Sequence, residues 1–234
     1  MSKKYHFVLL ALVLALFTTC YPVSRYIQPD PVLQWESAIR KFDSLNAVEY
    51  SDANTLLVTG SSSVRIWDSI HTDLAPFQVM QRGYGGAKLS DLNYYAHRII
   101  KPHQFKAILV FVANDISGSE DDRIPREVLQ LFKTLVRQIR ERNPDTPVCW
   151  IEITPTPKRW HVYKQIHEAN TLIRKYCERN EDLHFIETSD AYMTSEGLPD
   201  SAYFRKDMLH LNREGYLKWT ERIKASLFEE GFIP

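Results

Sequence analysis

One stretch decides the fold of this chain: Leu56-Leu57-Val58-Thr59-Gly60-Ser61-Ser62-Ser63-Val64-Arg65. Its first half is apolar and β-prone, and it ends in a glycine followed by three serines and a segment able to begin a helix. A serine at the carboxyl end of a parallel strand lies where open α/β sheets place their chemistry. The free backbone N–H groups at the start of the next helix would stabilise an oxyanion there. The serines could also simply cap that helix, so the choice between a catalytic serine and a helix cap depends on the rest of the chain.

Strand and helix patterns alternate five times along the chain. Strands are expected at Thr55–Thr59, Phe77–Gln81, Phe105–Val112, Val148–Ile153 and Leu183–Glu187. Helices are expected at Trp35–Leu45, Ser63–His71, Leu89–Ile100, Glu127–Arg142, Trp160–Arg179 and Leu211–Phe228, with Asn212 as a cap. This alternation predicts an α/β fold with a five-stranded parallel sheet, strand order 2-1-3-4-5, and helices on both faces.

Composition predicts one globular domain with no nucleic-acid partner. The 234 residues are 44% apolar and 25% charged, and 29 Lys plus Arg balance 29 Asp plus Glu, so no basic excess is available to neutralise phosphates. Cys149 and Cys177 fall in a predicted strand and a predicted helix, which favours buried free thiols over a disulfide. No Cys or His spacing typical of a metal site is present in the sequence, so no metal is expected.

The N-terminus has the pattern of an export signal. Lys3 and Lys4 precede the apolar run Phe7–Phe17, and small residues follow up to Cys20. The run resembles a bacterial lipoprotein signal, in which the cysteine is lipidated after cleavage, although Thr19 stands where Gly or Ala is usual. As a helix the run spans only about 16 Å, against roughly 30 Å of hydrocarbon, but a longer segment could just serve as an anchor.

We therefore expect three parts: a signal peptide or N-terminal membrane anchor at 1–23, a lead-in segment at 24–50, and a single domain at 51–234. The expected location is the periplasm or cell envelope, with a possible membrane tether through the N-terminus.

Residues suited to acyl-transfer chemistry fall in loops of the predicted fold. Ser62, Gly86 and Asn114 follow the carboxyl ends of the first three strands, and Asp207 and His210 precede the closing helix. A serine needs a base to become a nucleophile; His210 could take its proton, and Asp207 could orient the imidazole. The backbone N–H groups of Ser62 and Gly86 and the amide of Asn114 are candidate donors to an oxyanion.

Four sequence blocks resemble those of the SGNH (GDSL-like) hydrolases, in that family's order, between Asn54 and Trp219. The blocks are Gly60-Ser61-Ser62, Gly83-Tyr84-Gly85-Gly86, Asn114-Asp115 and Asp207-Met208-Leu209-His210. The resemblance implies a flavodoxin-like three-layer α/β/α fold and hydrolysis of esters or thioesters without a cofactor. It implies Ser62 as nucleophile, His210 and Asp207 as its partners, and an oxyanion hole of Ser62, Gly86 and Asn114. Gly60–Trp67 and His210–Asn212 are similar to a bacterial subgroup described as carbohydrate or acyl-chain esterases.

Two positions depart from the family pattern. Ser61 replaces the usual Asp of the first block, and alignment with that block favours Ser62 over its neighbours as nucleophile. Val112 replaces the usual Gly two residues before Asn114, which could narrow the site or shift the amide.

The sequence thus predicts an exported serine esterase acting on acyl esters, with O-acetyl groups on carbohydrate as the favoured substrate. A lysophospholipase or thioesterase of the same family, and a non-catalytic glycan-binding domain, are the alternatives. Individually, His210 could be structural, and Asn114 with Asp115 could simply close a turn. Trp160 and the loop Thr154–Pro157 lie at the same rim and could contact substrate.

Overall fold

Five parallel strands form one sheet in the order β2-β1-β3-β4-β5 in the computed structural model, which describes residues 32–100 and 103–232. The predicted leader at 1–23 lies outside the described residues. The strands are β1 (Thr55–Gly60), β2 (Gln78–Gly83), β3 (Ala107–Phe111), β4 (Val148–Ile151) and β5 (Leu183–Ile186). The predicted parallel sheet and its strand order are confirmed.

The three interior strands carry the most continuous apolar sequence. Every residue of β1, β3 and β4 is buried, as expected for parallel strands covered by helices on both faces. Gly60 at the end of β1 is in register with Gly83 of β2 and with Phe111 of β3. Three strands therefore end side by side, and the loops that leave them begin at one rim of the sheet.

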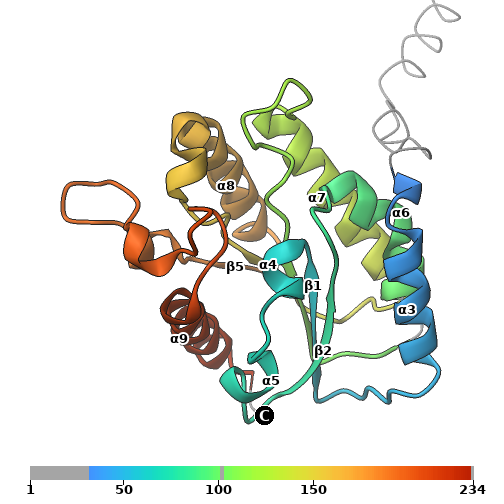
Figure 1. Ribbon diagram of the computed structural model, residues 1–234. Helices are drawn as coiled ribbons and strands as arrows, with labels where there is room; N and C mark the ends of the chain where they lie inside the picture. Colours follow the sequence, from blue (N-terminus) through green and yellow to red (C-terminus); the bar gives the residue numbers. More distant parts are fainter. Residues whose placement is uncertain (1–31, 101–102, 233–234) are drawn as a thin grey trace, which may run out of the picture.

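Helices cover both faces of the sheet (Figure 1). α6 (Leu89–Ile99), α7 (Pro125–Arg140) and α8 (Tyr163–Cys177) pack side by side on one face, as right-handed crossovers require. α4 (Ser62–Arg65), α5 (Ile70–Asp73) and the closing helix α9 (Arg213–Glu229) lie on the other. The lead-in helix α3 (Glu36–Asn46) packs against α6. The result is the predicted three-layer arrangement.

The helix predicted at Ser63–His71 is wrong, because the structure has the two short helices α4 and α5 there. Gln81 of β2 donates its side-chain amide to the backbone oxygens of Val64 and Trp67, at 2.6 and 3.2 Å. The Val64 oxygen also accepts the Trp67 N–H at 3.3 Å, which is the tighter spacing of a 3₁₀ turn, and α4 ends there. Trp67 can then turn inward, and it is fully buried.

Short 3₁₀ turns position the loops at the carboxyl rim. η2 (Pro157–Val162) forms the start of the helix predicted from Trp160, and α8 continues it. η3 (Ser189–Tyr192) and η4 (Ser201–Tyr203) lie in the segment predicted to be irregular. Asn212 caps α9 as expected, because its side chain accepts a hydrogen bond from the Gly215 N–H.

Cys149 and Cys177 are buried free thiols. Across residues 32–100 and 103–232, none of the helices has both the length and the apolar sequence needed to cross a membrane.

Candidate active site

A sharp turn after β1 presents Ser62 to the rim of the sheet. Gly60 has φ 137°, and a Cβ there would lie 1.8 Å from the backbone oxygen of Phe111. Only glycine fits this position, because the neighbouring strand approaches the turn too closely for any side chain. The Ser61 N–H donates to the same Phe111 oxygen at 3.0 Å, so Ser61 turns inward and Ser62 comes next.

Ser62, His210 and Asp207 form a continuous hydrogen-bonded chain. His210 Nε2 lies 2.9 Å from Ser62 Oγ, and His210 Nδ1 lies 2.6 Å from Asp207 Oδ2. The carboxylate can only accept, so Nδ1 carries the ring proton and Nε2 is free to accept one from the serine. The sequence separates Ser62 from His210 by 148 positions, and only the fold brings them into contact.

The turn that carries the histidine also fixes the aspartate. Asp207 Oδ1 accepts the backbone N–H groups of Leu209 and His210, each at 3.0 Å. Burial would raise the pKa of Asp207, but the hydrogen bonds from the His210 ring and from these two N–H groups outweigh it and lower the pKa to about 2. Asp207 is therefore a carboxylate throughout the physiological pH range.

Asn114 and Gly86 lie next to one another beside this chain. A Cβ on Gly86 would be 3.8 Å from Asn114 Nδ2, and that amide nitrogen donates to the Ala87 oxygen at 3.1 Å. In the described part of the chain, neither Ser62 nor Gly86 donates its N–H to a backbone acceptor outside its own helix or strand. These two N–H groups and the second N–H of the Asn114 amide are thus available to an oxyanion.

Arg159 of η2 is a site residue that the sequence reasoning missed. Its guanidinium donates to Asn114 Oδ1 at 2.6 Å and to the Ala113 oxygen at 2.7 Å, and only 9% of the residue is exposed. Burial lowers the pKa of Arg159. The available signal was its place one residue before Trp160, in a loop that leaves the carboxyl end of the fourth strand.

A small cavity of about 20 Å³ opens beside the serine. Its lining includes Ser62, Asn114 and His210, with Gly86 and Asp207 outside it. The other lining residues are partly apolar, namely Phe111, Ala113, Leu209, Leu211 and Trp219, and partly polar, namely Ser61, Ser63, Thr154, Thr156 and Arg159. Thr154 and Thr156 belong to the rim loop singled out from the sequence. Trp160 instead stacks on Tyr163, with ring centroids 4.5 Å apart.

Asp115, which follows Asn114, has a structural contact. It is buried, and its Oδ2 accepts the N–H of Leu89 at the start of α6, at 2.9 Å. Burial raises the pKa of Asp115 to about 6.

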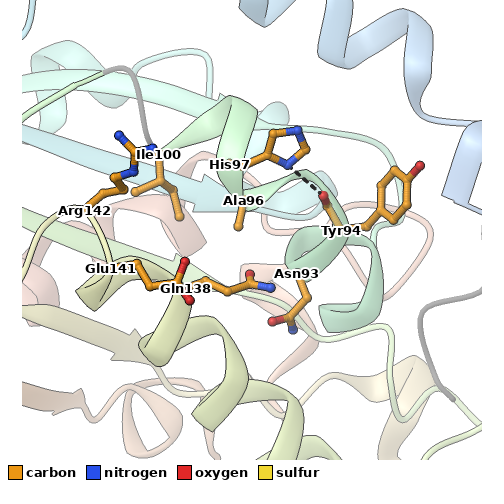
Figure 2. A pocket seen from close by; sticks show the side chains of 8 residues that line it. All are labelled: Asn93, Tyr94, Ala96, His97, Ile100, Gln138, Glu141 and Arg142. Carbon is orange, nitrogen blue, oxygen red and sulfur yellow. Dashed lines mark hydrogen bonds between the residues drawn. The ribbon is translucent and has the colours of Figure 1, made fainter. Parts of the chain in front are cut away.

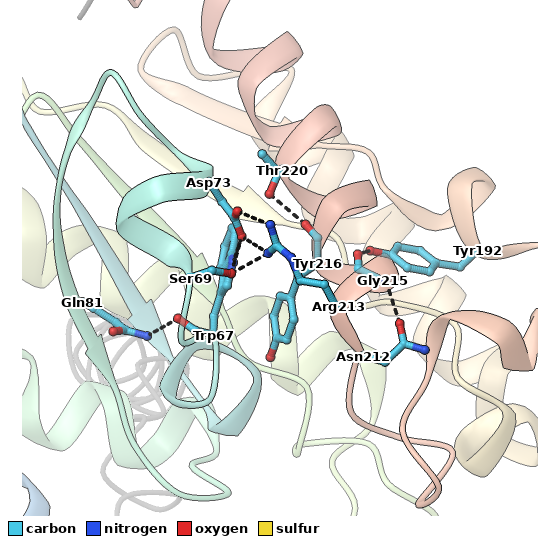
Figure 3. A network of polar contacts seen from close by, with 10 residues as sticks. All are labelled: Trp67, Ser69, Asp73, Gln81, Tyr192, Asn212, Arg213, Gly215, Tyr216 and Thr220. Atoms are coloured by element: carbon cyan, nitrogen blue, oxygen red, sulfur yellow. Dashed lines mark hydrogen bonds and ion pairs between the residues drawn. The ribbon is translucent and has the colours of Figure 1, made fainter.

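A network of polar contacts ties the segment after Ser62 to α9 (Figure 3). Arg213 donates to both oxygens of Asp73, at 2.6 and 2.7 Å, and Trp67 Nε1 donates to Asp73 Oδ2 at 2.7 Å. Tyr216 donates its hydroxyl to the Ser63 oxygen at 2.7 Å and stacks on Trp67. The network holds the element after His210 against the element after Ser62.

A larger cavity of about 180 Å³ lies between α6 and α7 (Figure 2). The described residues that line it include His97 and Glu141 but neither serine nor cysteine. His97 Nδ1 faces the Tyr94 oxygen of its own helix, at 3.2 Å. This cavity therefore lacks the nucleophile and base that the rim site brings together. Among the described residues, no cluster of His, Cys, Asp and Glu is arranged to hold a metal ion.

The fold and the rim site define a class of proteins with a flavodoxin-like three-layer α/β/α fold and a serine, histidine and aspartate at the carboxyl rim of the sheet. The sequence profile of the GDSL-like Lipase/Acylhydrolase family matches residues 43–218. The chain belongs to this family, whose members hydrolyse ester bonds. No curated protein sequence matches the chain significantly.

Solved structures of the same fold are distant in sequence. A protein from Streptococcus pneumonia, provisionally described as a platelet activating factor, is 18% identical, with a TM-score of 0.71 over 93% of this chain and 99% of that one. A GDSL-like lipase from Bacteroides thetaiotaomicron is 14% identical, with a TM-score of 0.67 and coverage of 82% and 97%. A carbohydrate esterase family 3 protein from Talaromyces cellulolyticus is 15% identical, with a TM-score of 0.58 and coverage of 75% and 96%.

Proposed function

We propose that this protein is an exported serine esterase that removes short acyl groups, above all O-acetyl groups on carbohydrate, through an acyl-enzyme on Ser62. The observation that carries the proposal is the hydrogen-bonded chain from Ser62 through His210 to Asp207, placed beside the Asn114 amide. Export rests on the N-terminal sequence pattern alone.

The geometry suits a two-step acyl transfer. His210 Nε2 takes the proton of Ser62 Oγ as the oxygen attacks the ester carbonyl carbon, and Asp207 stabilises the imidazolium. The carbonyl oxygen becomes an oxyanion, which accepts hydrogen bonds from the N–H groups of Ser62 and Gly86 and from the Asn114 amide. His210 then gives the proton to the departing alcohol as the ester C–O bond breaks. A water deprotonated by His210 hydrolyses the acyl-enzyme and releases the acid.

The size of the cavity supports a short acyl group. About 20 Å³ is room for roughly one water-sized group, which matches the methyl of an acetyl ester. Its lining includes the apolar residues Phe111, Leu211 and Trp219, which suit an apolar methyl. The carbohydrate esterase among the structural neighbours supports a sugar as the alcohol.

The test is hydrolysis of p-nitrophenyl esters from acetate to octanoate by the purified full-length chain, beside Ser62→Ala and His210→Ala. We expect the highest kcat/KM with acetate, and a loss of at least about 10³-fold in both variants. Ser195→Ala is the matched control, because it removes an exposed serine hydroxyl that does not line the cavity and should leave activity unchanged.

A maximum at octanoate would favour a lysophospholipase or thioesterase instead. A wild type no faster than Ser62→Ala on these esters and on an acetylated sugar would favour a glycan-binding domain.

A further inference from the structure

The Arg159 guanidinium is buried at the edge of the cavity without an ion-pair partner among the described residues. Its bonded acceptors are neutral oxygens, those of Ala113 and Asn114. Burying a cation against neutral acceptors is costly compared with leaving it in water. Packing alone therefore does not explain why position 159 holds a charged side chain.

The contacts of Arg159 leave the Asn114 amide only one orientation. Arginine has donors and no acceptor, so the side-chain oxygen of Asn114 must face it. The amide nitrogen is then directed to the opposite side, where one of its two N–H groups meets the Ala87 oxygen at 3.1 Å. The other N–H is left for the oxyanion beside Gly86.

We infer that Arg159 is a positioning residue that orients and polarises the Asn114 amide as an oxyanion donor; this inference rests on the proposed function. A hydrogen bond to a cation draws electron density from the amide oxygen, which makes the amide N–H a stronger donor. The second bond, to the Ala113 oxygen, holds the backbone that carries Asn114. Both effects act on the transition state, where the negative charge develops.

The sequence supplies a reason for such support in this chain. Val112 occupies the position where the family pattern has a glycine, two residues before Asn114, and its side chain is buried. A branched, buried side chain therefore stands where the family pattern has none. The contacts from Arg159, which comes from the next loop of the rim, fix the amide from outside its own strand.

The experiment is a double-mutant cycle between Arg159→Met and Asn114→Ala, in the full-length chain with p-nitrophenyl acetate as substrate. We expect Arg159→Met to lower kcat about 10- to 100-fold with little change in KM, because removal of an oxyanion donor costs about 10²–10³-fold. In the Asn114→Ala background the same change should have no further effect, since the amide it acts on is gone.

A second readout follows the oxyanion site itself. An alkyl boronic acid forms a tetrahedral adduct with a nucleophilic serine, and we expect its inhibition constant to rise in Arg159→Met by the same factor by which kcat falls. Arg140→Met is the matched control, because that guanidinium also donates to backbone oxygens, those of Asn143, Thr146 and Asp182, at the amino end of the sheet. It should lower the melting temperature without changing kcat.

If Arg159→Met does not fold, Arg159→Lys takes its place in the cycle. Lysine keeps the charge and can donate to one of the two oxygens, that of Ala113 or that of Asn114. We therefore expect a smaller loss of kcat, and no loss when the same change is made in the Asn114→Ala background. An equal loss in both backgrounds, or an unchanged kcat, would overturn the inference and leave the esterase intact. Full activity in Ser62→Ala would instead overturn the proposed function.

Discussion

At the scale of single residues, three consecutive serines have three different surroundings. Ser61 is buried, Ser62 contacts His210, and the backbone oxygen of Ser63 accepts the Tyr216 hydroxyl. The difference arises from the turn at Gly60, which sets which hydroxyl emerges from the rim. Alignment with the family block favoured Ser62, and the observed contact with His210 agrees with that assignment.

The orientation of the His210 ring gives a prediction for Asp207→Asn. The asparagine keeps an oxygen for the N–H groups of Leu209 and His210, so the turn should survive. Its NH₂ group would donate to Nδ1 and move the ring proton to Nε2, facing Ser62. We expect kcat to fall by about 10²–10⁴-fold, with a change of melting temperature of only a few degrees.

Asp200→Asn is the control for this change, because Asp200 caps η4 by accepting the Ala202 N–H and has no histidine partner in the described chain. Its kcat should equal that of the wild type. Retention of full activity in Asp207→Asn would contradict the role given to the carboxylate.

The glycine at position 60 gives a prediction for stability. In Gly60→Ala the new methyl would lie 1.8 Å from the Phe111 oxygen in a backbone conformation that L-residues avoid. We expect a loss of about 3 kcal/mol or more in the free energy of unfolding, measured by urea denaturation.

The matched change is Gly197→Ala. Gly197 also has a positive φ, of 75°, but a Cβ there has open space around it. This variant should lose only about 1 kcal/mol, the cost of the backbone conformation alone. Equal losses in the two variants would show that the contact with Phe111 does not matter.

At the scale of elements, the site depends on how α9 is held against α5. The tie is the contact of Arg213 with both oxygens of Asp73, which is almost fully buried (Figure 3). Burial alone would raise the pKa of Asp73, but hydrogen bonds from Arg213, Trp67 and Ser69 lower it to about 2. Folding therefore favours the ionised form of this carboxyl group.

This shift predicts how stability depends on pH. A carboxyl group whose pKa is lower in the folded state stabilises the fold above its unfolded pKa of 3.8, and that contribution is lost as the pH falls toward 2. We expect Asp73→Asn to be less stable than the wild type by about 2 kcal/mol at pH 7, with the difference shrinking between pH 4 and 2.

Asp190→Asn is the comparison, because Asp190 pairs with Arg222 on the exposed surface. Its effect should be about 0–1 kcal/mol at pH 7. A destabilisation of Asp73→Asn that stays constant down to pH 2 would contradict the explanation based on ionisation. Thermal unfolding of the three proteins across the pH range measures all of these differences.

At the scale of the whole molecule, the sheet brings residues from distant parts of the sequence to one rim. β1, β2 and β3 end in register, so the loops that carry Ser62, Gly86 and Asn114 start together. The return of the chain from β5 to α9 then carries His210 to the same rim. One surface therefore collects all five residues proposed to act on the ester.

The N-terminal pattern gives a prediction for the whole chain in the cell. Full-length protein produced in a bacterium should be recovered in the envelope fraction, because residues 1–23 have the pattern of an export signal. A chain without these residues should remain in the cytosol. Cys20→Ser distinguishes lipid attachment at Cys20 from an uncleaved anchor or a cleaved signal. It should release the protein from the membrane if Cys20 is lipidated, and it should leave the location unchanged in the other two cases. Recovery of the full-length chain from the cytosol would contradict export.

The sequence by itself determined the layers of the fold and the strand order, because parallel strands buried on both faces require long apolar runs. It also predicted candidate residues for the site, because the family blocks fall in the loops between those elements. It did not predict the break between α4 and α5, where Gln81 from a neighbouring strand donates to the oxygens of Val64 and Trp67. Nor did it reveal Arg159, because this residue contacts Asn114 and Ala113, which lie 45 and 46 positions earlier in the sequence. Local pattern encodes elements, whereas side-chain contacts between distant elements exist only once the chain has folded.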